Sequence, residues 1–529
     1  MNRLFDKANK RVSFGGAATL LIVVALVGQL LGFFRNRLVS ANFTVVDPGS
    51  SDAFFAAFQI PDFFFYTISA GALGVAFMPF LADHLQRGDK KGVWQLVNSL
   101  MNLLMIVMLA VAVVIFFFAE PLIHHVVAPK IEGQHLRDAV TIMRLIALNP
   151  LLFTVSGIIT SVQQTFGRFF FFAIAPLTYN LSIIAGLYLF KHNLGIVALG
   201  VGALVGAVIQ LLIASLGLLG LGFQYRPKIS WRSRDFHKIL RQLPPRSVDQ
   251  GIDSINSIVE TNRAQQLGPG PVSFYNYALT LMNVPVALIG TSIATAAFPR
   301  LTDRLAQNRA DLFRKEFLSI LRSMIWISMP VIVVCFFCRG YLARLLFGQS
   351  APAVALVFGY LTIAIFFRIM YSIISRYFYA QKNTKTPLLV SMFAIILNIV
   401  LVFSLAKPSA YGLAGLAMAQ SLVAMSEVLI LLGIMLYKDR RLLNMAFWGG
   451  VGRIVSVTGF SLIAAFIMIT ILPLKLTDVG FITLGAKLAI ITFVTFSVHL
   501  SLSSLFELEE ALPVVAKIKQ IVLKPIRIQ

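Results

Sequence analysis

The chain has 529 residues, of which 58% are hydrophobic and only 13% are charged. Soluble globular proteins contain about 45–50% apolar and about 25% charged residues, so this composition excludes a water-soluble enzyme. Its two cysteines exclude a disulfide scaffold. The net charge of +23 suits basic membrane loops and anionic lipid better than nucleic acid, which we do not expect as a partner.

Long apolar segments recur along the whole chain and predict an all-α polytopic membrane protein, because a helix of about 20 apolar residues spans the hydrocarbon core. These segments predict about 14 transmembrane helices, and they begin near residues 17, 54, 94, 138, 169, 194, 244, 272, 316, 354, 386, 410, 451 and 481. The segment at residues 244–266 is too polar for hydropathy alone and is assigned from its spacing and its neighbours. Lys and Arg concentrate in alternate loops, which places both termini in the cytoplasm.

A short motif occurs twice and indicates an internal duplication. Residues 79–85 read PFLADHL and residues 299–305 read PRLTDRL, each at the cytoplasmic end of a predicted span. Six spans separate the copies, so the repeat is parallel. Two six-helix lobes and an extra C-terminal helix pair follow from it. The predicted parts are a basic cytoplasmic N-terminus at 1–16, an N-lobe at 17–220, a basic cytoplasmic linker at 221–243, a C-lobe at 244–437, the extra pair at 451–507 and an amphipathic cytoplasmic tail at 508–529.

Span seven carries a polar stripe at helical spacing. Its members are Arg246, Asp249, Asp253, Asn256, Glu260 and Arg263. Charged groups at membrane depth cost about 2.5–3.5 kcal/mol each on insertion scales, so they usually face a wet cavity or one another. The stripe is interpreted either as one wall of a hydrated cavity between the lobes or as a set of structural ion pairs. In the first interpretation Asp249, Asp253 and Glu260 couple transport to a cation or proton, or act as a gate.

In the first lobe, Arg35 ends span one and Asp52 opens span two. Arginine suits phosphate because its planar guanidinium donates two parallel hydrogen bonds and stays charged at any relevant pH. Arg35, Asp52, Arg246 and Arg263 are therefore the candidate substrate-binding residues. The alternative for Arg35 is an interfacial side chain that reaches the headgroups.

Motifs for ATP binding, hydrolysis and metal coordination are missing from the sequence. We expect no catalytic activity, no cofactor and no metal site. Cys335 and Cys338 form a C-x-x-C pair, but it lies in an apolar run without histidine, so ordinary helix packing is the favoured interpretation.

Three segments together resemble the MurJ/MviN family: residues 31–35 (LGFFR), 51–61 (SDAFFAAFQIP) and 76–79 (AFMP). Residues 385–387 (KTP) resemble the same family's segment before span eleven. The resemblance implies a member of the multidrug/oligosaccharidyl-lipid/polysaccharide exporter superfamily. It implies a flippase for lipid II, the undecaprenyl-pyrophosphate-linked peptidoglycan precursor, with two lobes rocking around a cationic cavity and a lipid-tail groove at the last two spans.

Arg35 and Asp52 match charged positions of that family, but other positions of its cavity are neutral in this chain. They are Gln29, Phe65, Leu279, Thr280 and Asn283. Either the charges of span seven replace them, or the substrate differs.

The favoured function is therefore a lipid II flippase of the bacterial cytoplasmic (inner) membrane that works by alternating access. The lipid-linked precursor and membrane lipids are its expected partners, with a monovalent cation or proton and cell-wall synthesis enzymes as further candidates. Two alternatives remain open: an exporter of small cationic or amphipathic compounds, and a non-transporting scaffold for cell-wall enzymes.

Overall fold

The computed structural model describes residues 14–43, 50–70, 77–440, 442–475, 477–478 and 480–523, and within these ranges it contains helices and no strands. Contacts divide the chain into two compact units, Met1–Ser273 and Phe274–Gln529. This confirms the all-α fold class. The basic segment before residue 14 and the last six residues lie outside the described ranges.

Unit 1 contains the helices of the first half of the chain. They are α2 (Phe14–Asn42), α3 (Ser51–Phe64) with the π-helical turn η1 (Phe65–Ala70), α4 (Met78–Gln86), α5 (Lys90–Pro121) with the π-helical turn η3 (Leu122–Val127), α6 (Gly133–Ile146), α7 (Asn149–Thr165), α8 (Phe170–Leu194), α9 (Val197–Leu216) and α10 (Arg234–Gln266). Helix α10 packs on α3 and η1 within this unit. It begins at Arg234, so part of the predicted linker 221–243 is helical and continuous with the polar segment.

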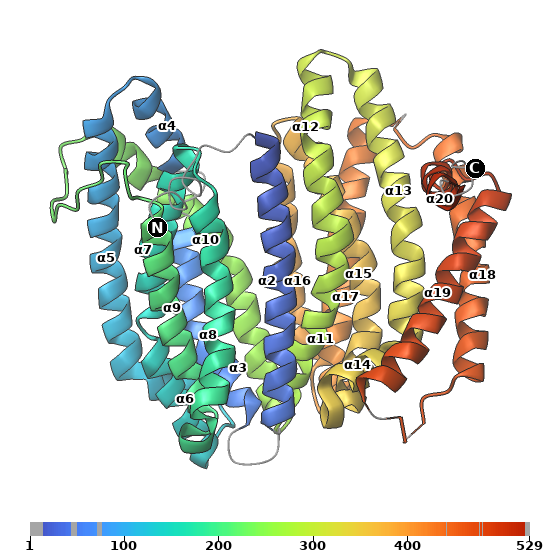
Figure 1. Ribbon diagram of the computed structural model, residues 1–529, viewed down its shortest axis with the longest axis horizontal. Coiled ribbons are helices and arrows are strands. Elements are labelled where there is room, and N and C mark those ends of the chain that lie inside the picture. The colour runs from blue at the N-terminus through green and yellow to red at the C-terminus, as the bar shows by residue number, and fades with distance from the viewer. Residues whose placement is uncertain are drawn as a thin grey trace. The chain divides into compact units, whose positions relative to one another are not determined.

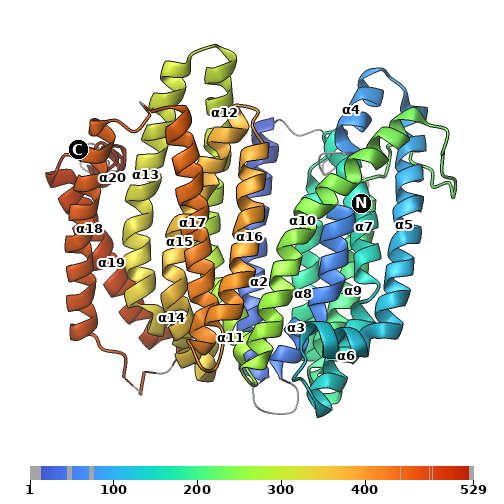
Figure 2. The ribbon, with the colours of Figure 1, turned by 180° about the vertical axis from the view of Figure 1, so that it is seen from behind.

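Unit 2 contains the remaining helices (Figures 1 and 2). They are α11 (Pro271–Pro285), whose first turn belongs to unit 1, the π-helical turn η4 (Val286–Thr291), α12 (Ser292–Ala306), α13 (Ala310–Phe337), α14 (Arg339–Phe347), α15 (Ala351–Ala380), α16 (Lys385–Leu405), α17 (Gly412–Lys438), α18 (Met445–Ile471), α19 (Phe481–Leu505) and α20 (Leu512–Leu523). The predicted tail at 508–529 thus contains a short helix. The lobe boundaries inferred from the repeat stay a prediction, because the two units are defined by contacts and not by the repeat.

Twelve described segments are long and apolar enough to cross a membrane. They correspond to twelve of the predicted spans. The two predicted spans absent from this set are the one that contains α3 and the polar helix α10. A total of about 14 therefore stays a prediction, while the multi-pass architecture is confirmed.

The duplicated motif adopts the same turn in both copies, which supports the parallel repeat. In each copy three backbone amides after the motif close the helix end in the same register. In the first copy the backbone amides of Arg87, Gly88 and Asp89 donate to the carbonyls of Asp83, Leu85 and His84. In the second copy the amides of Gln307, Asn308 and Arg309 donate to the carbonyls of Asp303, Leu305 and Arg304. Gly88 and Asn308 occupy the same left-handed position, with φ of 72° and 56°. Asparagine and glycine are the residues that tolerate this conformation best.

A π-helical turn follows a proline in both halves. Pro61 lies in the last turn of α3 before η1, and Pro285 ends α11 directly before η4. Proline has no amide hydrogen for the i−4 carbonyl, so the helix widens nearby to recover its hydrogen bonds. Residues 58–61 (FQIP) and 282–285 (MNVP) thus precede the same irregularity of the backbone.

Helices α8 and α9 make the closest helix pair of unit 1 and lie side by side in Figure 1. A Cβ placed on Gly202 would lie 2.7 Å from the Ser182 carbonyl oxygen, and one on Gly186 would lie 2.8 Å from the Gly202 Cα. A Cβ on Gly206 would approach Ser182 and Tyr179 at 3.0–3.1 Å. The three glycines therefore allow close packing of α8 and α9, because any larger side chain would force the backbones apart.

Candidate functional site

Arg35 lies in the C-terminal part of α2, half-buried and held by amide side chains. Its Nη1 donates to Asn180 Oδ1 of α8 at 3.0 Å, and its Nε and Nη2 donate to Asn36 Oδ1 at 3.2 and 3.1 Å. Asp62 of α3 is close enough to interact electrostatically with Arg35. The guanidinium is thus positioned by neutral acceptors, with one carboxylate nearby.

Asp52 is buried at the start of α3, with 2% of its surface exposed. Its Oδ2 accepts a hydrogen bond from the Gly270 amide at 2.7 Å, and its Oδ1 accepts one from the Ser273 amide at 2.8 Å. The Ser273 hydroxyl also donates to Oδ1. A carboxylate at a helix N-terminus satisfies amides that have no partner within the helix. Asp52 therefore caps the first turn of α11, and its hydrogen bonds go to this turn and not to Arg35.

The stripe of span seven lies on α10 within unit 1. Glu260 is buried with 5% of its surface exposed and accepts from Asn256 Nδ2 at 3.1 Å, while Asp253 is exposed. Arg263 donates to Gln266 Oε1 at 2.6 Å. The side chains of Arg246 and Asp249 lie outside what the structure describes. The stripe thus runs from an exposed carboxylate to a buried one, and its predicted roles stay a prediction.

The positions that are neutral here relative to the resembled family have ordinary surroundings. Phe65 packs edge-on against Phe153, with ring centroids 5.6 Å apart, and the Thr280 hydroxyl donates to the Asn276 carbonyl of its own helix at 2.8 Å. Gln29 and Asn283 are exposed.

A charged cluster of unit 2 was missed by the sequence analysis. Arg368 of α15 contacts Glu427 and Gln420 of α17, and Glu427 also accepts from Ser391 of α16. Neither Arg368 nor Glu427 has another charged residue within one turn of its own helix, so the sequence shows no charged stripe there. A single charge near the middle of a predicted span was the signal that could have found it.

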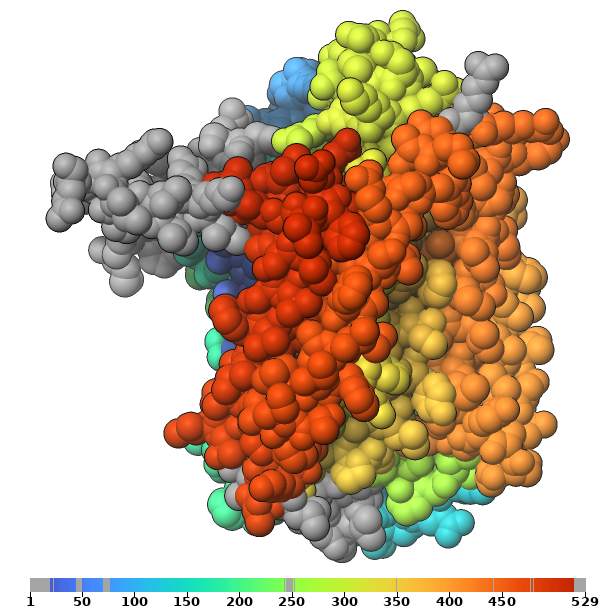
Figure 3. Space-filling model, turned by 90° about the vertical axis from the view of Figure 1, so that its right-hand side faces the viewer, coloured from blue at the N-terminus to red at the C-terminus, as the bar shows by residue number. Residues whose placement is uncertain are grey.

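An apolar pocket of about 730 Å³ lies on unit 2, and α14 and α19 line it. Its walls include Leu345, Phe481, Leu488 and Phe493. Figure 3 shows α19, in red, on the face of unit 2 that is turned toward the viewer. A surface of this kind suits a hydrocarbon chain and offers little to a polar ligand.

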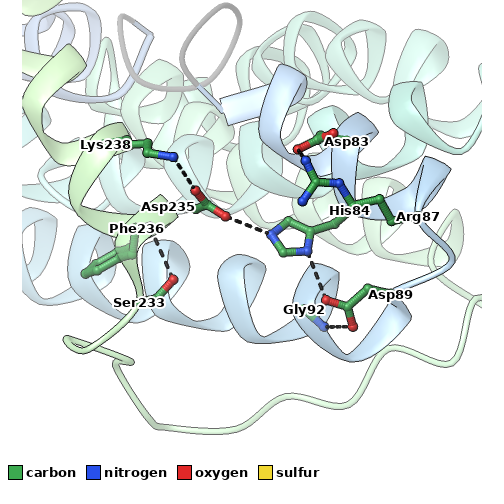
Figure 4. Close-up of polar contacts among 9 residues, drawn as sticks. All are labelled: Asp83, His84, Arg87, Asp89, Gly92, Ser233, Asp235, Phe236 and Lys238. Carbon is green, nitrogen blue, oxygen red and sulfur yellow. Dashed lines mark hydrogen bonds and ion pairs between the residues drawn. The ribbon is translucent and has the colours of Figure 1, made fainter.

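A second polar cluster joins α4, the start of α5 and the start of α10 outside the apolar segments (Figure 4). We call His84, Asp89 and Asp235 the His84 cluster. His84 Nδ1 lies 3.0 Å from Asp89 Oδ2, and its Nε2 lies 3.3 Å from Asp235 Oδ2. Only a doubly protonated imidazole can donate to both carboxylates. The amide of Gly92, followed by His84, lowers the pKa of Asp89, and Lys238 is the main cause that lowers the pKa of Asp235.

Among the described residues, no group of three or more His, Cys, Asp and Glu side chains could hold a metal ion. Cys335 and Cys338 are buried free thiols on α13 and at its end. Their setting agrees with the packing role expected from the sequence.

Comparison with known proteins gives one consistent result. A family model described as "Lipid II flippase MurJ" matches residues 48–488. A probable lipid II flippase MurJ of Borreliella burgdorferi is 25% identical over 422 residues, which cover 78% of this chain and 82% of that protein. A solved lipid II flippase MurJ in an inward closed conformation matches with a TM-score of 0.77 at 22% identity, covering 92% of this chain and 98% of its own. An inward-facing MATE family multidrug resistance transporter of the MOP superfamily matches with a TM-score of 0.62 at 13% identity, over 80% of this chain and 94% of that chain. At these identities the two structures inform on the fold alone.

Proposed function

Because the chain belongs to the MurJ family of lipid II flippases, we propose that it moves lipid II across the bacterial cytoplasmic membrane by alternating access. The observation that carries this proposal is the family match over residues 48–488, which includes Asp52 and nearly all of the predicted spans. The multi-pass helical fold agrees with such a transporter. Chemistry on the substrate is not part of the proposal.

The substrate's pyrophosphate binds to Arg35 in this proposal. Asn180 and Asn36 hold the guanidinium through neutral oxygens, so it keeps its positive charge for an anionic ligand. Arg246 or Arg263 of α10 supplies a second cation. Asp52 contributes to the site indirectly, because it fixes the first turn of α11.

Asp249, Asp253 and Glu260 are proposed to couple or gate the movement. The support is the position of Asp253 and Glu260 on one helix, where one carboxylate is exposed and the other is buried. Such a gradient suits the uptake of a monovalent cation or proton from water into the protein.

The apolar pocket between α14 and α19 is proposed to hold part of the lipid tail. Burying a hydrocarbon chain there gains about 25 cal/mol for each Å² removed from water, so the tail would anchor the substrate while its headgroup crosses. Both termini are proposed to lie in the cytoplasm.

A decisive experiment uses a bacterium whose own lipid II flippase can be switched off. Cells that express this chain should keep growing and should keep moving lipid II to the outer leaflet, measured by its accessibility to an externally added precursor-degrading enzyme. Arg35→Ala should abolish this movement without loss of membrane insertion. Arg37→Ala, which removes a neighbouring arginine of α2, is the matched control and should retain activity.

Failure of the wild-type chain to move lipid II in these cells would contradict the proposal. The alternative of a cationic exporter is favoured by the neutral positions Gln29, Phe65 and Thr280, which remove positive charge from the resembled cavity. It predicts binding that strengthens with the positive charge of the compound.

A further inference from the structure

A network of charged and polar side chains joins α15, α16 and α17 of unit 2. These three helices pack together and are labelled in Figure 2. Arg368 occupies the central turns of α15, and Glu427 occupies those of α17. Each belongs to a segment that is apolar enough to cross a membrane. A charged side chain in such a segment is costly to insert into a membrane and points to a functional role by default.

Glu427 is the better satisfied of the two charges. It has 4% of its surface exposed, and its Oε1 accepts from the Ser391 hydroxyl at 2.7 Å. Tyr371 extends the network, since its hydroxyl lies 3.0 Å from Ser391 Oγ. These contacts keep the carboxylate in place whether or not Arg368 stays beside it.

Arg368 is held loosely by comparison. Its Nη1 lies 3.4 Å from Glu427 Oε2, and its Nη2 lies 3.2 Å from Gln420 Oε1. Charge-assisted hydrogen bonds of arginine are usually about 2.7–2.9 Å long. A third of the Arg368 side chain (33%) is exposed. A guanidinium at membrane depth with long contacts and an exposed face retains donors for another partner.

The same three chemical groups occur around Arg35 in unit 1. There the arginine is bound by an amide of α8, Asn180, with the Asp62 carboxylate in electrostatic range. In unit 2 the amide is Gln420 and the carboxylate is Glu427. In both units, therefore, an arginine, an amide and a carboxylate from different helices come together.

We propose that Arg368, positioned by Gln420, is a second anion-binding subsite that takes a phosphate or pyrophosphate group. Glu427 competes with the anion for Arg368. Its carboxylate pairs with Arg368 when the subsite is empty, and the bound anion replaces this carboxylate as the partner of Arg368. The inference rests on the proposed function only for the identity of the natural anion, which would be the pyrophosphate of the lipid-linked precursor.

The test measures binding of inorganic pyrophosphate and of farnesyl pyrophosphate to the full chain in detergent, by calorimetry. Arg368→Gln should weaken binding of the anion by about tenfold or more, since it removes a charge-assisted contact. Glu427→Gln should strengthen binding a few-fold, because the competing carboxylate is gone while the amide still accepts from Ser391. Glu316→Gln disrupts the 3.0 Å ion pair with Arg304 in the same unit and is the matched control, expected to bind as wild type.

An ion pair with only a structural role predicts a different pattern, in which Glu427→Gln lowers the thermal midpoint and leaves anion affinity unchanged or weaker. That result, or unchanged binding in Arg368→Gln, would overturn the inference. Should Arg368→Gln fail to fold, Arg368→Lys and Glu427→Gln still decide, because lysine keeps the charge but loses the planar pair of donors. Tighter binding of farnesyl pyrophosphate than of inorganic pyrophosphate assigns the subsite to a lipid headgroup, and equal affinity assigns it to a free anion.

Loss of the proposed function is distinguishable from loss of this subsite. A wild-type chain that binds pyrophosphate through Arg368 but moves no lipid II keeps the subsite and refutes the flippase. If the Arg368→Gln variant moves lipid II as well as the wild-type chain does, the flippase function stands and the subsite has no part in it.

Discussion

At the scale of single residues, Arg35 and Asp52, the two positions that match charged residues of the family, have physical roles that differ from each other. Arg35 is half-buried among neutral oxygens, as a binding cation should be. Asp52 is fully occupied by two amides and a hydroxyl. The sequence places both residues at the ends of apolar segments but cannot show which partners they take, because those partners come from distant parts of the chain.

Replacement of Asp52 should mainly affect stability. Asp52→Ala leaves the amides of Gly270 and Ser273 buried without acceptors, at a cost of about 1–3 kcal/mol for each unsatisfied group. The thermal midpoint of the purified chain should fall by several degrees, while Asp52→Asn, which keeps one acceptor oxygen, should lose less. A midpoint equal to that of wild type in Asp52→Ala would show that water or another donor replaces the cap.

At the scale of elements, the two copies of the repeated turn carry different ion pairs. His84 of the first copy contacts Asp89 and Asp235, and the corresponding Arg304 of the second copy contacts Glu316 of α13 at 3.0 Å. The backbone of the turn is shared, so the difference lies in the side chains. Asp235 connects the turn to α10, which carries the polar stripe.

The His84 cluster should loosen once the pH falls below the usual carboxyl range. Since the pKa values of Asp89 and Asp235 are lowered, their stabilising contribution is present above the usual carboxyl range near about 4 and is lost as the pH drops through the lowered values. Hydrogen exchange at the start of α10 should accelerate on acidification beyond the intrinsic change of exchange rate with pH. Asp235→Asn should produce the same effect at neutral pH.

Asp303→Asn, which removes the carboxyl of the second turn, is the control and should leave exchange in α10 unchanged. Equal exchange in wild type and Asp235→Asn would mean that the His84 cluster does not hold this helix end.

At the scale of the whole molecule, hydropathy and loop charge account for most of the architecture. Twelve predicted spans match segments of the structure because each buries its own backbone hydrogen bonds and needs only an apolar surface. The bounds of helix α10 were harder to predict from the sequence, because its polar residues give no continuous apolar segment. The structure shows the helix packed on α3 and η1. The Arg368 network escaped prediction because its members come from three helices and pair only through tertiary packing.

The predicted orientation can be tested by cysteine labelling in a Cys335→Ala, Cys338→Ala background. An introduced cysteine at Lys228, which is exposed between α9 and α10, should be protected from a membrane-impermeant maleimide in intact cells, because that loop is predicted to be cytoplasmic. A cysteine at exposed Glu132, in a loop predicted to face outward, should be labelled. Labelling with the reverse preference would invert the topology.

The contact between Gly186 and Gly202 also limits how unit 1 can deform. Where two backbones touch with no side chain between them, neither helix can slide or rotate without a steric clash. Helices α8 and α9 should therefore move as one rigid body. Arg35 is connected to this helix pair by its hydrogen bond to Asn180 of α8. Shape changes within the unit must therefore be absorbed outside this helix pair. The π-helical turn η1 after Pro61 interrupts the regular hydrogen bonds of its helix and is one place that can bend.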